Sequence, residues 1–390
     1  MPFEILETET QGTIIKVIGI GGAGGNAVEH MIRRGVQGVE FICANTDHQA
    51  LSRSSARNVI QLGRTGLGAG SRPDVGRQAA EEARDRIADA LRGAHMVFIT
   101  AGMGGGTGTG AAPVVAEVAK ELGILTVAVV SKPFDFEGPK RMKVAEQGLV
   151  DLQDRVHSLI VILNNKLEEV LGEDAEMAGC FQAADDVLHN ACAGIAEIIN
   201  IPGLVNVDFE DVKTVMGEHG KAMMGTAMAG GTDRARVAAE QAVASPLLEG
   251  VDLSGARGVL VNITASTSLK MRETREVMTT IREFAAEDAT VIFGTVCDEA
   301  IGEKLRVTVV ATGLGKAAVK KAPLTVIKTV ADNAPAVVGS TSPGPGHDYS
   351  HLDTPAVWRS RDGAAVRAAV IDDAPAERLD IPAFLRKQAD

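Results

Sequence analysis

Two glycine-rich segments contain the residues best suited to chemistry in this chain of 390 residues. Residues 19–24 form the pattern G-x-G-x-x-G between an apolar stretch and a helical pattern. Residues 102–110 read Gly-Met-Gly-Gly-Gly-Thr-Gly-Thr-Gly, with six glycines in nine positions, and also precede a helical pattern. Backbone amides without side chains at the start of a helix bind phosphate groups. Each segment therefore predicts an anion site.

The first segment alone would suit a dinucleotide, because the pyrophosphate of NAD rests on such a turn and Glu40 or Asp47 could contact the ribose. A tight turn used only for packing is the simplest alternative. The second segment favours a nucleoside triphosphate that spans two adjacent strand ends, where Thr107 and Thr109 add hydroxyl groups. No G-x-x-x-x-G-K-S/T sequence occurs, so the chain is not a P-loop NTPase. An NAD-dependent oxidoreductase that uses only the first segment remains the alternative function.

Acidic residues elsewhere in the chain allow a structural interpretation first. Asp208 stands where it would cap a helix, and Asp211 would lie in the first turn of that helix. Glu137 and Arg141 have the i, i+4 spacing of an exposed ion pair. Spacing alone favours these structural roles.

The elements that must position these residues alternate along the first half of the chain. Apolar stretches of strand length alternate with helical patterns, which is typical of a parallel sheet built from βαβ units. We expect strands at residues 13–20, 39–45, 95–101, 124–131 and 158–164, and helices at residues 25–34, 72–92, 110–122 and 138–155. Several of these strands are apolar at consecutive positions, as expected for a sheet covered on both faces.

A long helical pattern without proline, from Glu176 to Asn200, precedes a different order of elements. We expect helices at residues 210–216, 234–244 and 270–286 and strands at residues 258–264, 290–296 and 305–312. The predicted fold class is α/β: a Rossmann-like parallel sheet joined by a long central helix to a smaller α+β domain. The predicted boundaries are 1–175 for the sheet domain, 176–205 for the central helix and the start of the next loop, 206–315 for the α+β domain, 316–376 for a disordered linker and 377–390 for a terminal peptide.

Composition narrows the class of protein further. A net charge of −12 and an aromatic content of 3% argue against binding to nucleic acid or to an anionic membrane surface. No apolar run reaches the length of a membrane span, and the N-terminus lacks the basic start of a signal peptide. The four cysteines are far apart and are expected to be buried thiols of a reducing cytosol: Cys43, Cys180, Cys192 and Cys297. We therefore expect a cytoplasmic protein.

The last residues differ from the stretch before them. Residues 316–376 are rich in Pro, Ala, Ser and Gly and are expected to stay flexible. The final segment returns to bulky apolar side chains, which is typical of a short peptide that docks in a groove of another protein. A chance tail composition is the alternative. The docking residues would be Asp380, Ile381, Pro382, Phe384, Leu385 and Arg386.

Residues 104–110, GGGTGTG, match the tubulin signature, and the neighbouring motifs resemble the tubulin/FtsZ family of GTPases over about residues 13–315 and the terminal peptide. The resemblance implies a cell-division GTPase that binds GTP or GDP and polymerises head to tail into the filaments of a mid-cell division ring. The implied phosphate and turn residues are Gly21, Gly22, Ala23, Gly24, Gly25, Asn26, Asn45 and Asp47, with Gly104, Gly105, Gly106, Thr107, Gly108 and Thr109 from the second segment. The implied ribose and guanine contacts are Glu137, Arg141, Asn164 and Asp186.

The same resemblance gives Asp208 and Asp211 a catalytic role. In this family their loop projects into the nucleotide site of the next subunit, where two aspartates assist the attack of water on the γ-phosphate. Mg²⁺ would be held mainly by phosphate oxygens and water, with Thr109 nearby, since no dedicated carboxylate cage is visible. The terminal peptide resembles the docking peptide for membrane-tethering division proteins such as FtsA and ZipA. Two residues beside Asn164 depart from the family's pattern: Leu163, where Pro is usual, and Asn165, where an acid is common.

Overall fold

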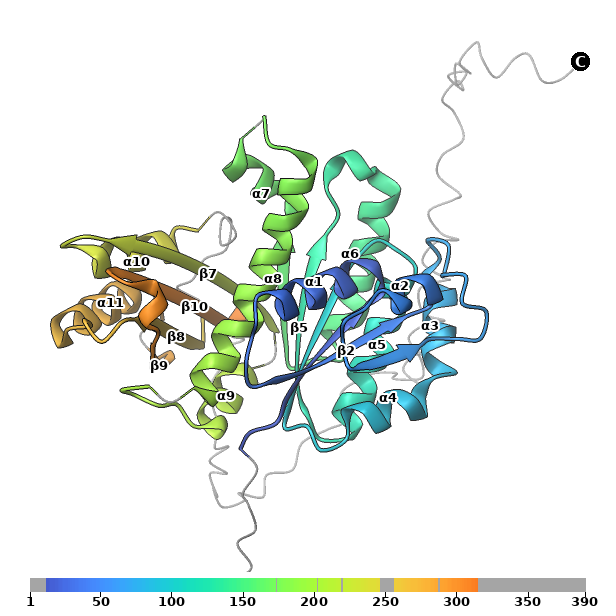
Figure 1. Ribbon diagram of the computed structural model, residues 1–390, viewed down its shortest axis with the longest axis horizontal. Helices are drawn as coiled ribbons and strands as arrows, with labels where there is room; N and C mark the ends of the chain where they lie inside the picture. The colour runs from blue at the N-terminus through green and yellow to red at the C-terminus, as the bar shows by residue number, and fades with distance from the viewer. Residues whose placement is uncertain are drawn as a thin grey trace, which may run out of the picture. The chain divides into compact units, whose positions relative to one another are not determined.

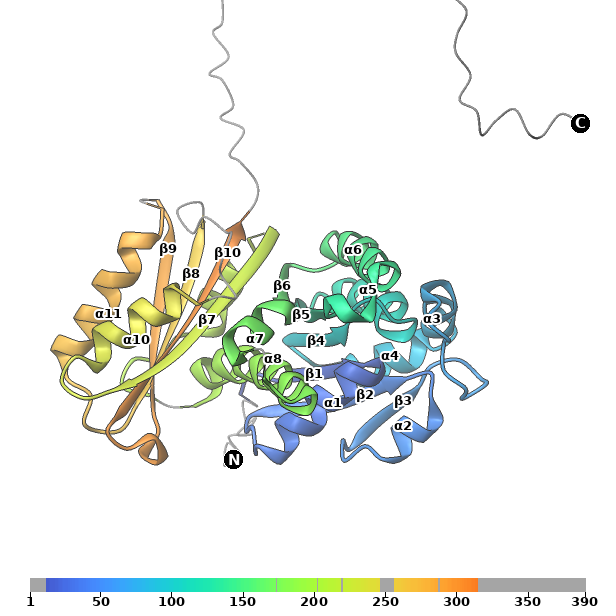
Figure 2. The same ribbon diagram turned by 90° about the horizontal axis from the view of Figure 1, so that it is seen from above.

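The computed structural model describes residues 12–314 apart from residues 173, 202, 219, 246–255 and 287. The first six strands are β1 (Ile15–Ile20), β2 (Val39–Asn45), β3 (Asn58–Gln61), β4 (Met96–Gly102), β5 (Leu125–Lys132) and β6 (Ser158–Leu163). They pair in parallel in the order β3-β2-β1-β4-β5-β6. This is the strand order of a Rossmann-like, doubly wound sheet. Figure 1 shows the chain coloured from blue at its N-terminus, and Figure 2 labels all six strands.

Helices cover both faces of this sheet, as Figure 2 shows. They are α1 (Gly21–Arg33), α2 (His48–Ser52), α3 (Pro73–Glu81), α4 (Arg84–Leu91), α5 (Thr107–Glu121), α6 (Pro139–Gln153), α7 (Asn164–Leu171) and α8 (Met177–Asn200). Apolar side chains of α1, α2 and α8 pack on one face of the sheet, and those of α3, α4, α5 and α6 pack on the other. Burial on both faces explains why β1 and most of β4 are apolar without alternation.

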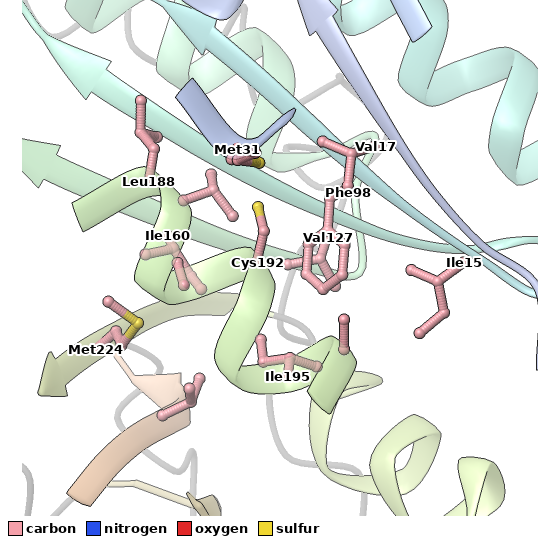
Figure 3. Packing of buried hydrophobic residues seen from close by; sticks show 14 of the residues in the cluster. Ile15, Val17, Met31, Phe98, Val127, Ile160, Leu188, Cys192, Ile195 and Met224 are labelled. Carbon is pink, nitrogen blue, oxygen red and sulfur yellow. The ribbon is translucent and has the colours of Figure 1, made fainter. Parts of the chain in front are cut away.

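The central helix α8 has 24 residues and packs against both halves of the molecule. Leu188, Cys192 and Ile195 of this helix are buried in one apolar cluster (Figure 3). That cluster also contains Ile160 from β6 and Met224 from the second half of the chain. Since one core is shared across α8, the helix fixes the two halves relative to each other.

The second half of the described chain adds four strands and three helices. They are α9 (Phe209–Met216), β7 (Gly220–Gly230), α10 (Arg234–Val243), β8 (Gly258–Ala265), α11 (Met271–Phe284), β9 (Thr290–Cys297) and β10 (Lys304–Leu314). The strand order is β7-β10-β8-β9, in which only β8 and β9 are parallel, and α10 and α11 cover one face. β7 also pairs with β6 from Ser158 to Ile160, so both halves belong to one sheet of ten strands.

The predicted fold class is confirmed, and most predicted elements are present within one to four residues of their expected ends. The expected helix at residues 72–92 is instead divided into α3 and α4, because Ala83 leaves helical geometry at φ −104° and ψ 8°. The strand expected at residues 158–164 ends at Leu163, since Asn164 begins α7. The sequence analysis did not predict β3, β7, α2 or α7.

Two further expectations concern single residues and the chain end. Cys43, Cys180 and Cys192 are buried, whereas Cys297 is exposed, so the expectation of four buried thiols is wrong at that position. The predicted linker and the terminal peptide lie outside the described residues. In the part of the chain that the structure describes, no helix is long and apolar enough to cross a membrane.

Candidate functional site

The two glycine-rich segments lie side by side at the carboxyl ends of β1 and β4. These strands are neighbours in the sheet, and Ile20 pairs with Ala101 at their ends. α1 begins at Gly21 and α5 begins at Thr107, so two helix N-termini open at the same edge. Gly21 has φ +74°, and a Cβ on it would lie 3.0 Å from the amide nitrogen of Gly108. The segments therefore touch where the strand order changes direction, which is where doubly wound sheets bind ligands.

The glycines of these segments divide into two groups by their surroundings. A Cβ at Gly108 or Gly110 would lie 2.5 or 2.0 Å from a backbone oxygen, so glycine is required there for packing. A Cβ at Gly22, Gly25 or Gly105 would meet no described atom within 4 Å. These three glycines leave open space beside amides at two positive helix ends, which is suited to phosphate groups.

The threonine hydroxyls of the second segment hold the loops in place. The Thr109 hydroxyl is buried and accepts a hydrogen bond of 2.9 Å from the Gly104 amide. The Thr107 hydroxyl lies 2.6 Å from the hydroxyl of Thr46, which follows β2. These bonds fix the second segment against itself and against the turn after β2.

The turn after β2 is built by Asn45 and Asp47. The Asn45 side-chain oxygen accepts a hydrogen bond of 3.2 Å from the Asp47 amide, and Asp47 caps α2 by accepting from the Gln49 amide at 2.8 Å. Asn45 lines a pocket together with Gly22 and Asn26 from the start of α1. The structure thus brings Asn45 to the first segment and gives the Asp47 carboxylate a capping role.

A second pocket lies beside the same glycine segments, toward α8, and is suited to a flat ring. Its lining includes Ala23, Asn26, Glu137, Arg141, Asn164, Phe181 and Asp185. Phe181 is exposed over 42% of its surface and meets Phe134 edge to face, with ring centroids 5.2 Å apart. Asn26 lines both pockets, so the two lie next to each other at the start of α1. Phosphate and ring sites are therefore contiguous.

Glu137 and Arg141 occupy this second pocket and also form the ion pair that their spacing predicts. Glu137 Oε2 lies 3.0 Å from Arg141 Nη1, and Glu137 Oε1 accepts a hydrogen bond from the Phe134 amide at 2.9 Å. The pair joins the short 3₁₀ helix η1 (Asp135–Glu137) to the start of α6. The structural role and the implied binding role are therefore compatible.

Asn164 is the buried polar residue of the pocket. It begins α7 directly after β6, and its side-chain oxygen has no hydrogen-bond partner among the described residues. An unpartnered buried oxygen that lines a pocket is suited to a ligand N–H group. The neighbouring Asn165 accepts a hydrogen bond of 3.0 Å from the Asp135 amide. Leu163 is the last residue of β6 and pairs with Lys132.

Asp186, an expected guanine contact, is bonded to residues of the α1 region, and its role in nucleotide binding stays a prediction. Its carboxylate Oδ1 lies 2.8 Å from Nε2 of His30, on α1, and accepts a hydrogen bond of 2.7 Å from Nη2 of Arg34, which directly follows α1. The preceding residue, Asp185, lines the pocket. Burial raises the pKa of Asp185 to about 6, while the nearby His30 acts in the opposite direction. Asp185 and Phe181 are two of the pocket residues that were not predicted from the sequence.

Asp208 and Asp211 lie near the amino ends of the parallel strands, opposite the glycine segments. Asp208 caps α9, and its carboxylate accepts a hydrogen bond of 2.8 Å from the Asp211 amide, as spacing alone predicted. Phe209 packs on His95, which directly precedes β4, with ring centroids 6.1 Å apart. The glycine segment follows the opposite end of β4, so the seven residues of that strand, roughly 20 Å, separate the acids from the loops.

No group of three His, Cys, Asp or Glu side chains in the described ranges is placed to hold a metal ion. The Thr109 hydroxyl, which was expected near Mg²⁺, is already bonded to the Gly104 amide. A metal bound with a nucleotide would therefore take most of its ligands from phosphate and water.

The fold and the two contiguous pockets define a tubulin-like nucleotide-binding GTPase. Residues 14–172 match the model of the Tubulin/FtsZ family GTPase domain, and residues 220–315 match the model of the FtsZ family C-terminal domain. The chain belongs to the FtsZ family.

Similar proteins agree over the whole length of the chain. It is 56% identical to the cell division protein FtsZ of Coxiella burnetii, over 99% of each chain, and 55% identical to that of Pseudomonas aeruginosa, over all of each chain. An FtsZ dimer from M. jannaschii is 42% identical with a TM-score of 0.75, covering 79% of this chain and 89% of that one. CetZ2 from Haloferax volcanii, 20% identical with a TM-score of 0.65 over 78% of this chain and 94% of that one, shares the fold.

These findings make the chain a cell-division GTPase that binds guanine nucleotide. They do not support the alternative of an NAD-dependent oxidoreductase. The glycine pattern G-x-G-x-x-G therefore does not identify an NAD-dependent oxidoreductase here.

Proposed function

We propose that this chain assembles head to tail and that GTP is hydrolysed only where two copies meet. The observation that carries the proposal is the separation of the two candidate half-sites. The glycine loops follow the carboxyl ends of β1 and β4, whereas Asp208 and Asp211 begin α9 near the amino end of β4. A single molecule cannot bring the glycine loops and the two aspartates together. The end of one copy that carries the glycine loops can instead meet the end of the next copy that carries Asp208 and Asp211. Such a heterologous contact does not close, so it produces filaments.

One large exposed apolar side chain lies near each half-site and would be buried in the proposed contact. Leu67 is 88% exposed and forms a bridge with Asp47 beside the turn after β2. Leu204 is 76% exposed and lies just before α9.

In the proposed complex, the phosphates rest on the two glycine segments. The contributing residues are Gly21, Gly22, Ala23, Gly24, Gly25 and Asn26 with Gly104, Gly105, Gly106, Thr107, Gly108 and Thr109, and Asn45 supports them from the turn after β2. The open amides at Gly22, Gly25 and Gly105 supply the donors. Mg²⁺ bound with the nucleotide would neutralise phosphate charge, held mainly by phosphate oxygens and water.

Asp185 and Asn164 provide the preference for guanine. The guanine N1–H and exocyclic amine are hydrogen-bond donors. Asp185 on α8 and Asn164 at the start of α7 both line the pocket and offer acceptor oxygens. Adenine offers an acceptor at N1, which would leave the Asp185 carboxylate without a partner and so bind poorly. Phe181 covers the ring, and Glu137 with Arg141 would contact the ribose.

The Asp211 carboxylate is available to polarise the attacking water. Asp211 is exposed, and among the described residues its carboxylate has no hydrogen-bond or ion-pair partner. One Asp208 oxygen is committed to capping α9, which leaves its other oxygen free. Phosphoryl transfer requires little beyond positioned donors, charge compensation and an oriented water. The two aspartates would supply the last of these in trans.

A mixing experiment tests the shared site. Asp211→Ala keeps a nucleotide site but lacks the acid, whereas Gly105→Ala keeps the acid but fills the open amide region. Each variant alone should lose GTP turnover, and an equimolar mixture should regain it, because about a quarter of random contacts pair an intact nucleotide site with an intact acid. Glu210→Ala, which removes an exposed neighbouring acid paired with Lys213, is the matched control and should turn over GTP normally. A mixture that stays inactive would show that the site is not shared.

The terminal peptide is proposed to tether the filament. Residues 380–386 lie outside the described residues, and their sequence resembles the docking peptide for FtsA and ZipA, which would bring the polymer to the mid-cell membrane. Deletion of residues 379–390 should leave assembly with GTP intact and abolish capture by an immobilised tether. Unchanged capture would refute the role of the peptide.

A further inference from the structure

The carboxyl end of α9 is held by two side-chain hydroxyls. The last carbonyls of a helix have no partner inside it, so they need donors from elsewhere. Ser158 Oγ donates a hydrogen bond of 2.7 Å to the Met216 carbonyl, and Thr312 Oγ1 donates one of 2.7 Å to the Val215 carbonyl. Both hydroxyl residues are completely buried, with no exposed surface. These two buried hydrogen bonds hold the carboxyl end of α9 in the interior of the protein.

The two hydroxyls come from different halves of the molecule. Ser158 begins β6 of the sheet that carries the nucleotide loops, and Asn164 of the guanine pocket directly follows the other end of that strand. Thr312 lies near the end of β10 in the C-terminal half. The end of α9 is therefore attached to both halves at adjacent carbonyls.

The local backbone makes room for the Thr312 contact. The pairing of β10 with β7 shifts register between Ala311 and Leu314, and such irregularities redirect side chains. A Cβ at Gly258, the strand partner of Thr312, would lie 2.6 Å from Thr312 Oγ1 and 3.2 Å from the Val215 carbonyl oxygen. Only glycine at position 258 leaves the Thr312 hydroxyl and the end of α9 in contact.

We propose that Ser158 and Thr312 are positioning residues that set the direction of α9, and with it the placement of Asp208 and Asp211 at its other end. This inference rests on the proposed role of the two aspartates. α9 has eight residues and is about 12 Å long, so a tilt of about 5° at its carboxyl end moves its first residue by about 1 Å. A displacement of that size at a reacting group can reduce a rate by about 100-fold.

Of the two hydroxyl residues, Ser158 has the larger influence on how α9 lies relative to the nucleotide loops. The loop before α9 is bonded to the C-terminal half, since Thr295 in β9 exchanges hydrogen bonds with Val205 at 2.8 and 3.0 Å. Thr312 adds a second bond to the same half. Ser158 supplies a hydrogen bond to the sheet that holds the glycine loops, so α9 keeps a fixed direction relative to that sheet.

The test compares variants that delete or retain each hydroxyl. Ser158→Ala and Thr312→Val remove it, and Thr312→Ser retains it. Thr126→Val is the matched control, because Thr126 is also completely buried and its hydroxyl donates to a backbone carbonyl, that of Ile124, at 2.9 Å. Three quantities are measured: GTP turnover per sedimented subunit, the Kd for GDP, and Tm.

We expect Ser158→Ala and Thr312→Val to lower turnover per assembled subunit on the order of ten-fold, with an unchanged Kd for GDP. Thr312→Ser should restore turnover, and Thr126→Val should lower Tm without affecting turnover. If the two deletions lower Tm only as Thr126→Val does, with normal turnover, the positioning role is wrong. Ser158→Ala removes a single oxygen, so the test stands even if Thr312→Val does not fold.

Asp211→Ala in the same assay separates failure of the positioning role from failure of the proposed function. If Asp211→Ala abolishes turnover while both hydroxyl deletions match the parent, only the positioning role fails. If Asp211→Ala hydrolyses GTP like the parent, the proposed function itself fails.

Discussion

Asp185 and Asp186 are adjacent in α8, yet their carboxylates meet different surroundings. Asp185 lines the pocket that also contains Asn164 and Phe181, whereas Asp186 is bonded to His30 on α1 and to Arg34 directly after it. Successive residues of a helix point about 100° apart, so two neighbours can serve two surfaces. α1 begins in the phosphate segment and α8 carries the base pocket, so the Asp186 contacts join the two parts of the nucleotide site.

Replacement of each acid should separate these roles. Asp185→Ala should weaken GDP binding about 10-fold to 100-fold, because one hydrogen-bonded charge is worth about 1.5–3 kcal/mol. Asp186→Ala should change the Kd for GDP by less than about three-fold and lower Tm slightly, because Arg34 and Asp186 are partly exposed to solvent. Titration of a fluorescent GDP analogue measures both. Equal loss of affinity in the two variants would mean that both acids contact the base.

The pH dependence of nucleotide binding should report on Asp185. Its pKa is raised to about 6 by burial, and in the proposed complex the carboxylate form would accept hydrogen bonds from guanine. GDP affinity should therefore be constant above about pH 7 and fall by up to about ten-fold per pH unit below pH 6. The Asp185→Asn variant should show a flat profile between pH 7 and pH 5. A parent profile that is equally flat would contradict the assignment.

The raised pKa of Asp185 also determines how the free energy of unfolding changes with pH. Because the pKa of Asp185 is higher in the folded state than in the unfolded chain, its stabilising contribution is present at low pH and is lost as the pH rises through about 6. Nucleotide-free Asp185→Asn should therefore be more stable than the parent at pH 8, and this advantage should disappear near pH 4. Urea unfolding at the two pH values measures it. An advantage of equal size at both would rule out titration as its cause.

The extent to which sequence predicted this fold depends on how locally each element is determined. β1, β4 and β5 are short, mostly apolar segments that are buried almost throughout, so their length is visible in the chain. β7 reads Gly-Lys-Ala-Met-Met-Gly-Thr-Ala-Met-Ala-Gly, which has weak strand propensity. It is a strand because β6 and β10 pair with it on its two sides. That information lies in other segments and is invisible to a local pattern.

The residues of the candidate site also differ in whether local sequence could predict them. The glycine segments follow from composition and from their place between a strand and a helix, since both signals are local. The difference between Asp185 and Asp186 depends on where His30 and Arg34, at the end of α1 and just after it, lie, more than 150 residues earlier in the chain. The adjacent acids carry no sequence signal for that difference. An exposed aromatic one turn before them, Phe181, was the available hint.

The glycine groups predict opposite outcomes for two similar substitutions. Gly105→Ala places a methyl group in open space, so the free energy of unfolding should stay within about 1 kcal/mol of the parent value, while GTP binding falls because the methyl group blocks the phosphate region. Gly110→Ala would place Cβ 2.0 Å from the Pro73 carbonyl oxygen, so α3 and α5 must separate. We expect it to destabilise the protein by about 1–3 kcal/mol or more. Thermal unfolding and nucleotide binding, measured on both variants, distinguish packing glycines from ligand-facing ones. Loss of stability in Gly105→Ala would show that its surroundings are not open.

The C-terminal half should depend on a buried ion pair between α10 and α11. Arg234 and Glu273 are 4% and 7% exposed, and Arg234 Nε donates a hydrogen bond of 2.7 Å to Glu273 while Nη2 donates one of 3.1 Å. Removal of one member leaves a buried charge unpaired, so Glu273→Gln should cost about 3–5 kcal/mol of unfolding free energy. Glu240→Gln, at an exposed pair with Arg236, is the control and should cost less than about 0.5 kcal/mol.

This ion pair also has a defined pH signature. The hydrogen bond from Arg234 holds the pKa of Glu273 below its ordinary value. A carboxyl with a lowered pKa stabilises the fold above its unfolded pKa, and that contribution is lost as the pH falls through the folded value. The stability difference between the parent and Glu273→Gln should therefore be full at pH 7 and shrink below about pH 4.5. Urea unfolding at pH 7 and pH 4 tests this. A difference that does not change with pH would mean that the loss comes from altered packing around Arg234 and not from its charge partner.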